Sequence, residues 1–221
     1  MKLYHGSQHI IEHPVYGQGK TWNDYGQAFY CTEDRDMAME WACPIMRDGY
    51  ANEYELDTKG LSLLDLTSED YHILNWLAVL LENRTFSIKS DLAESGYRYI
   101  TDTFGIDHKD YDLIKGYRAD DSYFSFANAF LNNAISLSRL NEAVRLGQLG
   151  EQIAIKSRKA FGQLTFKGYE SADGEMYFAR RRMRDLEARE AFNVIRSRSE
   201  LDGVYLLDIL RWKWGNDDAR L

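Results

Sequence analysis

The spacing of apolar and polar residues changes along the chain, and these changes predict a mixed α and β structure. Before residue 70, short strand-like segments alternate with polar stretches and one acidic helical segment. Thr32 is expected to cap this helix, because acidic residues follow it directly. The strands are predicted at 2–5, 27–32, 51–57 and 61–66, the helix at 33–41, and a long Gly- and Asn-containing loop at 6–25.

Helical periodicity dominates the middle of the chain. A helix opening at Ser68 carries Leu74, Leu77 and Leu81 on one face, and residues 120–147 form the longest periodic stretch. The last part is mixed, with strands at 151–156 and 163–169, a short helix capped by Ser157, a long charged helix at 174–198, and a strand or helix at 204–210. We therefore predict one α+β domain over residues 1–221 with a helical insertion at about 68–147.

The composition limits the binding partners and the cellular compartment that we expect for the protein. The 221 residues carry a net charge of -8, which argues against a general binder of phosphate backbones. The two cysteines, Cys31 and Cys43, are too few for a zinc site or a disulfide framework, so we expect no metal and a reducing compartment. No secretory signal and no apolar run of about 18 residues is visible, which predicts a cytoplasmic protein without membrane contact.

A basic run near the end of the chain has two interpretations. Arg180, Arg181, Arg182 and Arg184 are interleaved with acidic residues such as Asp185. This pattern is typical of a solvated helix face with short-range ion pairs. The alternative is a docking face for an acidic partner or a nucleic acid.

Three short segments carry the candidate chemistry. The first is Tyr4-His5-Gly6-Ser7, at the end of a predicted strand. The second is Gly26-Gln27-Ala28-Phe29-Tyr30, with Trp41 eleven residues after Tyr30 on the helix that follows. The third is Glu151-Gln152-Ile153, at the start of a strand. Adjacent strand residues point to opposite faces, so one of Glu151 and Gln152 can face a cleft, but not both.

In this order the segments resemble the ADP-ribosyltransferase superfamily, in the histidine–tyrosine–glutamate branch of the poly(ADP-ribose) polymerases and diphtheria-like toxins. The chain also looks like an uncharacterised bacterial family of that superfamily found near toxin–antitoxin genes. The resemblance implies a split β-sheet core with NAD as substrate. It implies Glu151 as the catalytic carboxylate, His5, Gly6, Ser7 and Gln152 as NAD contacts, and Tyr30 and Trp41 as a sandwich around nicotinamide.

The resemblance also implies an activity. The nicotinamide–ribose bond would be cleaved and ADP-ribose passed to a macromolecular acceptor by a toxin or effector that has a cognate antitoxin. His5 and Tyr30 would assist Glu151. Asp120 and Asp121 are candidates for helix capping or for the substrate site. The alternatives are an NAD glycohydrolase, with water as acceptor, and a catalytically inactive module of the same fold that binds a partner.

Overall fold

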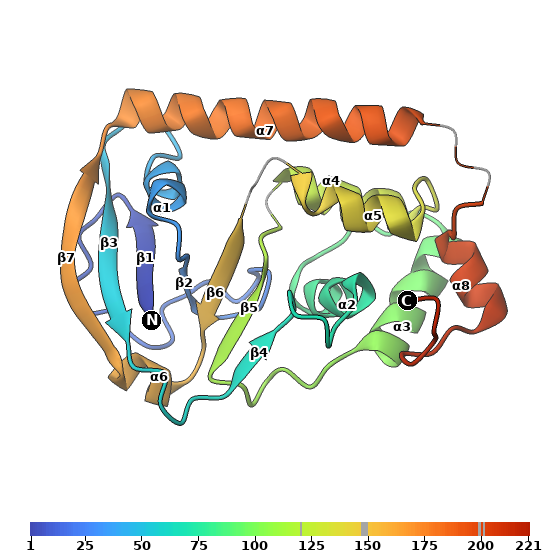
Figure 1. Cartoon of the computed structure of the whole chain (residues 1–221), viewed down its shortest axis with the longest axis horizontal. Coiled ribbons are helices and arrows are strands. Elements are labelled where there is room, and N and C mark those ends of the chain that lie inside the picture. Colours follow the sequence, from blue (N-terminus) through green and yellow to red (C-terminus); the bar gives the residue numbers. More distant parts are fainter. Residues whose placement is uncertain (120, 147–149, 199, 201) are drawn as a thin grey trace.

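Two β-sheets lie side by side and are flanked by helices (Figure 1). This computed structural model describes the chain except residues 120, 147–149, 199 and 201 and the side chains of residues 121–123. The first sheet is antiparallel, in the order β1 (Lys2–Ser7), β3 (Gly49–Leu56) and β7 (Leu164–Ala172). The second has the order β2 (Phe29–Cys31), β6 (Glu151–Ile155), β5 (Leu113–Tyr117) and β4 (Leu63–Asp65), with β4 and β5 parallel.

The sheets are joined at one point between β1 and β2. The Tyr4 amide donates to the Thr32 carbonyl at 2.8 Å, and the Thr32 amide donates back to Tyr4 at 2.9 Å. Beyond this bridge the sheets diverge, and side chains from both pack together. This shared cluster consists of Leu3, Cys31, Leu56, Leu113, Ile153, Ile155 and Ala160. The α+β class predicted from the sequence is confirmed.

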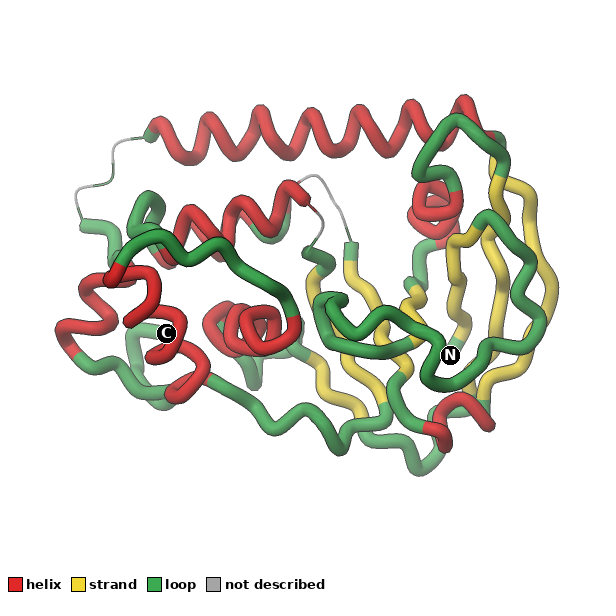
Figure 2. The backbone as a smooth tube through the Cα atoms, turned by 180° about the vertical axis from the view of Figure 1, so that it is seen from behind, coloured by secondary structure: helices red, strands yellow, loops and turns green. Residues whose placement is uncertain are grey.

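The helices are unevenly distributed. Apart from α1 and α6, they gather beside the second sheet or run across the top of the molecule (Figure 2). Their bounds are α1 Arg35–Ala42, α2 Ile73–Asn83, α3 Asp91–Phe104, α4 Asp121–Leu131, α5 Leu137–Ala143, α6 Arg158–Gly162, α7 Gly174–Ser197 and α8 Leu206–Trp212. The apolar helix α2 lies at the centre of the largest core cluster, where Trp76 is fully buried and its Nε1–H donates to the Tyr117 carbonyl at 3.2 Å.

Helix α7 connects the two halves of the molecule. Its N-terminal half packs on α1 beside the first sheet, and its C-terminal half packs on α4 and α5 (Figure 1). There Phe192 stacks on Phe126 with ring centroids 4.0 Å apart. Asp173 caps the helix by accepting from the Met176 amide at 2.7 Å. The long charged helix predicted at 174–198 is confirmed.

Several element boundaries differ from the sequence prediction. Asp34, rather than Thr32, caps α1, because its carboxylate accepts from the Met37 amide at 3.0 Å. Helix α2 begins at Ile73, five residues after Ser68. The long periodic stretch at 120–147 contains a break after α4, where Asn133 takes a φ of 58°, and Ser136 caps the new helix α5.

The insertion predicted as helical at about 68–147 also contributes a strand. β5 lies inside it and pairs with both β4 and β6 in the middle of the second sheet. Its pattern was missed because five buried or half-buried residues give no clear period of two. Helix α3 was missed as well, and the segment at 204–210 becomes α8.

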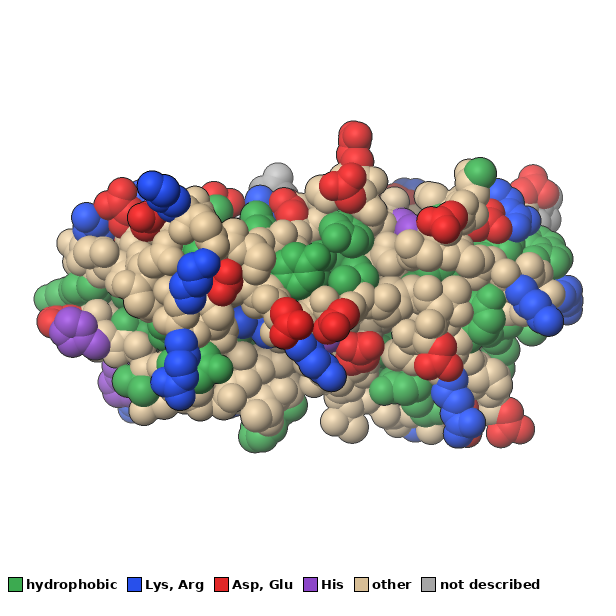
Figure 3. Space-filling view, turned by 90° about the horizontal axis from the view of Figure 1, so that it is seen from below, with side chains coloured by type: hydrophobic (Ala, Val, Ile, Leu, Met, Phe, Trp, Pro, Cys, Tyr) green, Lys and Arg blue, Asp and Glu red, His purple; other side chains and the backbone are tan. Residues whose placement is uncertain are grey.

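The surface and the helices add two observations. On the face seen in Figure 3, acidic and basic side chains are interspersed and do not gather by sign. Among the helices the structure describes, none combines the length and the apolar character needed to cross a membrane.

Candidate functional site

The three sequence segments border one pocket where the two sheets diverge. The pocket has a volume of about 740 Å³, within the range of about 300–1,000 Å³ typical of small-molecule sites. His5, Gly6, Tyr30, Trp41 and Gln152 all line it. They reach it from β1, β2, α1 and β6, so residues far apart in the sequence converge as predicted.

His5 is fixed by the strand next to it. Its Nδ1 lies 2.7 Å from the Tyr30 carbonyl oxygen, and its ring stacks on Phe29 with centroids 4.3 Å apart. Burial lowers the pKa of His5, so the neutral ring is favoured. A carbonyl accepts a hydrogen bond, so the proton sits on Nδ1, and Nε2 is left as an acceptor. His5 can therefore accept from a sugar hydroxyl, rather than donate to it.

Tyr30 presents its ring, not its hydroxyl, to the pocket. The hydroxyl donates to the Gly26 carbonyl at 2.7 Å and accepts from the Tyr25 amide at 3.0 Å. Both groups belong to the turn before β2, where Gly26 takes a φ of 77° that favours glycine. Burial raises the pKa of Tyr30 far above its usual range, so the phenol stays protonated. These contacts give Tyr30 a positioning role and leave its ring as a flat wall.

Replacing Tyr30 with phenylalanine should therefore separate stability from binding. The two backbone groups lose their partner, which should cost about 1–3 kcal/mol and lower Tm by several degrees. The ring remains, so affinity for NAD, the substrate that the resemblance implies, should stay within about twofold of wild type. Thermal unfolding and calorimetric titration with NAD measure the two effects. A variant with unchanged Tm and lost turnover would instead assign the hydroxyl to the chemistry.

Trp41 forms a second aromatic wall. The guanidinium of Arg118 lies over its ring, 4.9 Å from the centroid, so a cation already covers one part of the indole. The Nε1–H of Trp41 is buried and finds no acceptor among the described residues. Trp41 therefore contributes its ring, and not an accessible N–H, to the pocket.

A buried carboxylate lies behind these side chains. Asp24 accepts from Gln152 Nε2 at 2.7 Å, from the Ala119 amide at 2.9 Å and from Arg84 at 3.2 Å. Burial raises the pKa of Asp24, while these donors and the charges of Arg84 and Arg118 oppose the shift. Because a carboxylate accepts hydrogen bonds, the Gln152 nitrogen must face Asp24. The amide oxygen is then the atom that Gln152 can offer to a hydroxyl in the pocket.

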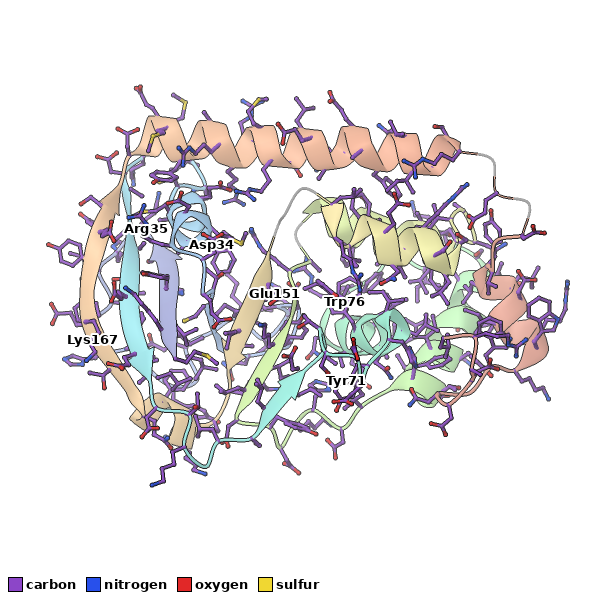
Figure 4. All side chains as sticks on the ribbon, in the orientation of Figure 1. Asp34, Arg35, Tyr71, Trp76, Glu151 and Lys167 are labelled. Atoms are coloured by element: carbon purple, nitrogen blue, oxygen red, sulfur yellow. The ribbon has the colours of Figure 1, made fainter. Side chains whose placement is uncertain are left out.

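Gln152, not Glu151, enters the pocket. Tyr30 pairs with Ala154 across β2 and β6, and Gln152 lies two residues from Ala154, so both side chains share one face of the sheet. Glu151, on β6 (Figure 4), points to the opposite face, where a carboxylate oxygen lies 2.8 Å from Lys115 Nζ and the side chain is 44% exposed. The prediction that Glu151 enters the cleft is therefore wrong.

Gly6 lines the pocket, but its missing Cβ is required elsewhere. A Cβ at this position would lie 2.0 Å from the Ala38 carbonyl oxygen and 2.8 Å from both the Ala42 amide and Trp41 Cβ. These atoms belong to helix α1, which packs directly on β1. The neighbouring Ser7 lies outside the pocket lining, and its Oγ accepts from the His9 amide at 3.1 Å.

The substitution Gly6→Ala should therefore destabilise the protein by about 1–3 kcal/mol, because α1 must move away from β1. Urea denaturation measures this loss. Gly162→Ala is the matched control, since a Cβ at Gly162 meets no atom within 4 Å. Equal stability of the two variants would contradict the packing role and leave ligand approach as the reason for the glycine.

The remaining predicted residues lie in different places. Asp120 and the side chain of Asp121 are outside the described part of the structure, so their roles stay predictions. The arginines of the basic run at 180–184 contact different groups. Arg180 lies 3.6 Å from Asp36, and Arg184 forms an ion pair with Glu40. Arg181 reaches the pocket from α7. The four arginines therefore do not form one continuous free cationic face.

Sequence reasoning missed three charged residues of the site. Asp24 lies two residues before the Gly26 turn, and its role depends on contacts with residues 84, 119 and 152. Arg84 follows α2 and Arg118 follows β5, and both line the pocket. No spacing in the sequence links these positions, although an acidic residue before a Tyr-Gly turn is a signal that could have marked Asp24.

Comparisons with known proteins place the chain in a family. No curated protein and no solved structure gives a match. The family model described as "Protein of unknown function (DUF3990)" matches residues 1–166, which include every pocket residue except Arg181. The chain therefore belongs to the DUF3990 family.

Proposed function

We propose that the protein is an NAD-dependent ADP-ribosyltransferase. The observation that carries this proposal is the convergence of His5, Tyr30, Trp41 and Gln152 on one pocket of about 740 Å³. These positions match, in order, the segments that resemble the ADP-ribosyltransferase superfamily. The two sheets, which diverge beside this pocket, are compatible with the split core expected of that superfamily.

The side chains suit the parts of NAD. His5 Nε2 can accept from a ribose hydroxyl, since its Nδ1 is engaged with the Tyr30 carbonyl. The rings of Tyr30 and Trp41 offer aromatic walls to a flat cationic ring such as nicotinamide. The Gln152 amide oxygen can accept from the second ribose, near the bond that breaks.

In the proposed reaction the bond between nicotinamide and ribose C1′ breaks, and its electron pair leaves with nicotinamide, which becomes neutral. A new bond forms between C1′ and the acceptor, which releases a proton. Positive charge develops on the ribose in the transition state. The buried carboxylate of Asp24 accepts from the Gln152 nitrogen and so holds the Gln152 amide with its oxygen available to the ribose.

The presence of an amide at position 152 also bears on the alternative functions, NAD hydrolysis and binding without turnover. An amide cannot take a proton from an acceptor, so activation of the acceptor falls to Asp24 or to the acceptor's own environment. An NAD glycohydrolase would use water at the same position. A binding module without turnover would use the pocket for recognition alone.

Incubation of the purified protein with NAD labelled in its adenylate phosphate tests the proposal. With a bacterial lysate present, we expect label in macromolecules and equimolar release of nicotinamide. Free ADP-ribose without labelled macromolecules would identify the hydrolase instead. NAD binding by calorimetry without nicotinamide release would identify the binding module, and no binding at all would refute every NAD-based function.

A role as a toxin is supported by the resemblance alone. We propose that the acceptor is a macromolecule of the host cell and that a cognate antitoxin covers the pocket or its entrance. Growth arrest on expression, relieved by loss of NAD cleavage, would support this role. Normal growth of cells that contain active enzyme would argue against a toxin.

A further inference from the structure

Helix α7 supplies one side chain to the pocket although it lies beyond the region matched by the family model. Arg181 is half-buried on this helix and lines the pocket. It forms no ion pair with the described residues, whereas Arg180 and Arg184 on the same helix pair with Asp36 and Glu40. A guanidinium that faces a pocket without a carboxylate partner is suited to an anionic ligand.

The pocket is cationic despite the negative net charge of the chain. Lys20, Arg84, Arg118 and Arg181 line it, against the single carboxylate of Asp24 among its described lining residues. Arg84 bonds to that carboxylate, so it is already neutralised. Arg118 lies over the Trp41 ring of α1, and Arg181 lines the pocket from α7. The composition of the chain alone would not place these charges together.

An ion pair holds α7 against α1 beside Arg181. Arg184 Nε and a terminal nitrogen donate to the two Glu40 oxygens at 2.9 and 2.8 Å, and Glu40 is only 4% exposed. Arg184 lies one turn after Arg181, and Glu40 immediately precedes Trp41. The pair therefore fixes the two helices at the point where each supplies a pocket residue.

We propose that Arg181 binds the diphosphate of the dinucleotide, together with Arg118, so that α7 completes the substrate site. This inference rests on the proposed function for its choice of ligand. A diphosphate lies between the two nucleoside halves of NAD, and those halves suit the His5–Phe29 stack and the Tyr30 and Trp41 walls. The planar fork of arginine matches phosphate oxygens in pairs.

Calorimetric titration of the full chain and of Arg181→Gln tests this assignment, with NAD, ADP-ribose, inorganic pyrophosphate and adenosine as ligands. We expect Arg181→Gln to weaken binding of the three diphosphate ligands by about tenfold or more. Adenosine binding should not change. Arg196→Gln is the matched control, because Arg196 is an exposed residue about four turns away on the same helix.

The outcomes separate the inference from the function on which it rests. If Arg181→Gln and Arg196→Gln bound NAD equally well, the role of Arg181 would be overturned. It would also be overturned if Arg181→Gln weakened adenosine binding as much as NAD binding, because that result would indicate a structural effect. Pyrophosphate binding that depends on Arg181, without NAD binding, would support the anion site and refute the proposed function.

Discussion

Replacing Gln152 with alanine should lower the rate of NAD cleavage by about a hundredfold or more, whereas Glu151→Gln should leave it close to wild type. Gln152 is 4% exposed and its amide is fixed by Asp24, so no other side chain can take its position without rearrangement. Alanine removes the amide oxygen proposed to align the ribose and also leaves Asp24 without one of its donors. Nicotinamide release under saturating NAD measures the effect.

The adjacent residue provides the control. Glu151 lies on the other face of β6, and its exposed pair with Lys115 contributes at most about 1 kcal/mol to stability. Both variants should be checked for folding by circular dichroism before rates are compared. Full activity of Gln152→Ala, together with loss of activity in Glu151→Gln, would show that the carboxylate predicted from the resemblance acts in catalysis despite its position here.

The second large effect is expected at the contact between α7 and α1. Arg184→Ala should lower the free energy of unfolding by about 3 kcal/mol, because it leaves the carboxylate of Glu40 buried without its cation. The Glu40 side chain is 6% exposed and that of Arg184 is 24% exposed, so solvent cannot easily replace the pair. Urea denaturation monitored by tryptophan fluorescence measures the change, and Trp41 is close enough to report on it.

Arg182→Ala is the control for this experiment. Arg182 is exposed on the same helix, and its substitution removes the same charge. We expect its stability to remain within about 0.5 kcal/mol of wild type. The double variant Glu40→Ala with Arg184→Ala should recover part of the loss, because it buries no unpaired charge. Equal stability of Arg184→Ala and Arg182→Ala would show that the Glu40–Arg184 ion pair does not hold α7 against α1.

The site was predictable where its residues stand in short ordered segments. His5, Tyr30 and Trp41 were found because a strand end, a glycine turn and a helix place them in a recognisable order. The choice between Glu151 and Gln152 was not predictable, since strand alternation states that one faces inward but not which one. The register of β6 against β2 decides it.

The rest of the site depends on contacts over long distances in the chain. Asp24 and Arg118 acquire their roles through partners dozens of residues away, which local patterns do not reveal. The strand β5 shows the same limit in the fold, because its position between β4 and β6 is set by pairing and not by its own five residues. Helix α7, in contrast, was predicted nearly to its bounds from its charge pattern.

The order in which the pocket residues occur has a consequence for biosynthesis. Gln152 and Arg181 are among the last pocket residues in the sequence, and Asp24 obtains its Gln152 partner only when β6 has joined the second sheet. Chains emerge from the ribosome N-terminus first, and domains fold as units. A nascent chain thus holds His5, Tyr30 and Trp41 before it can close the pocket around a ligand. The complete pocket therefore arises only after residue 181 has been synthesised, so chains that stop before it carry no complete site.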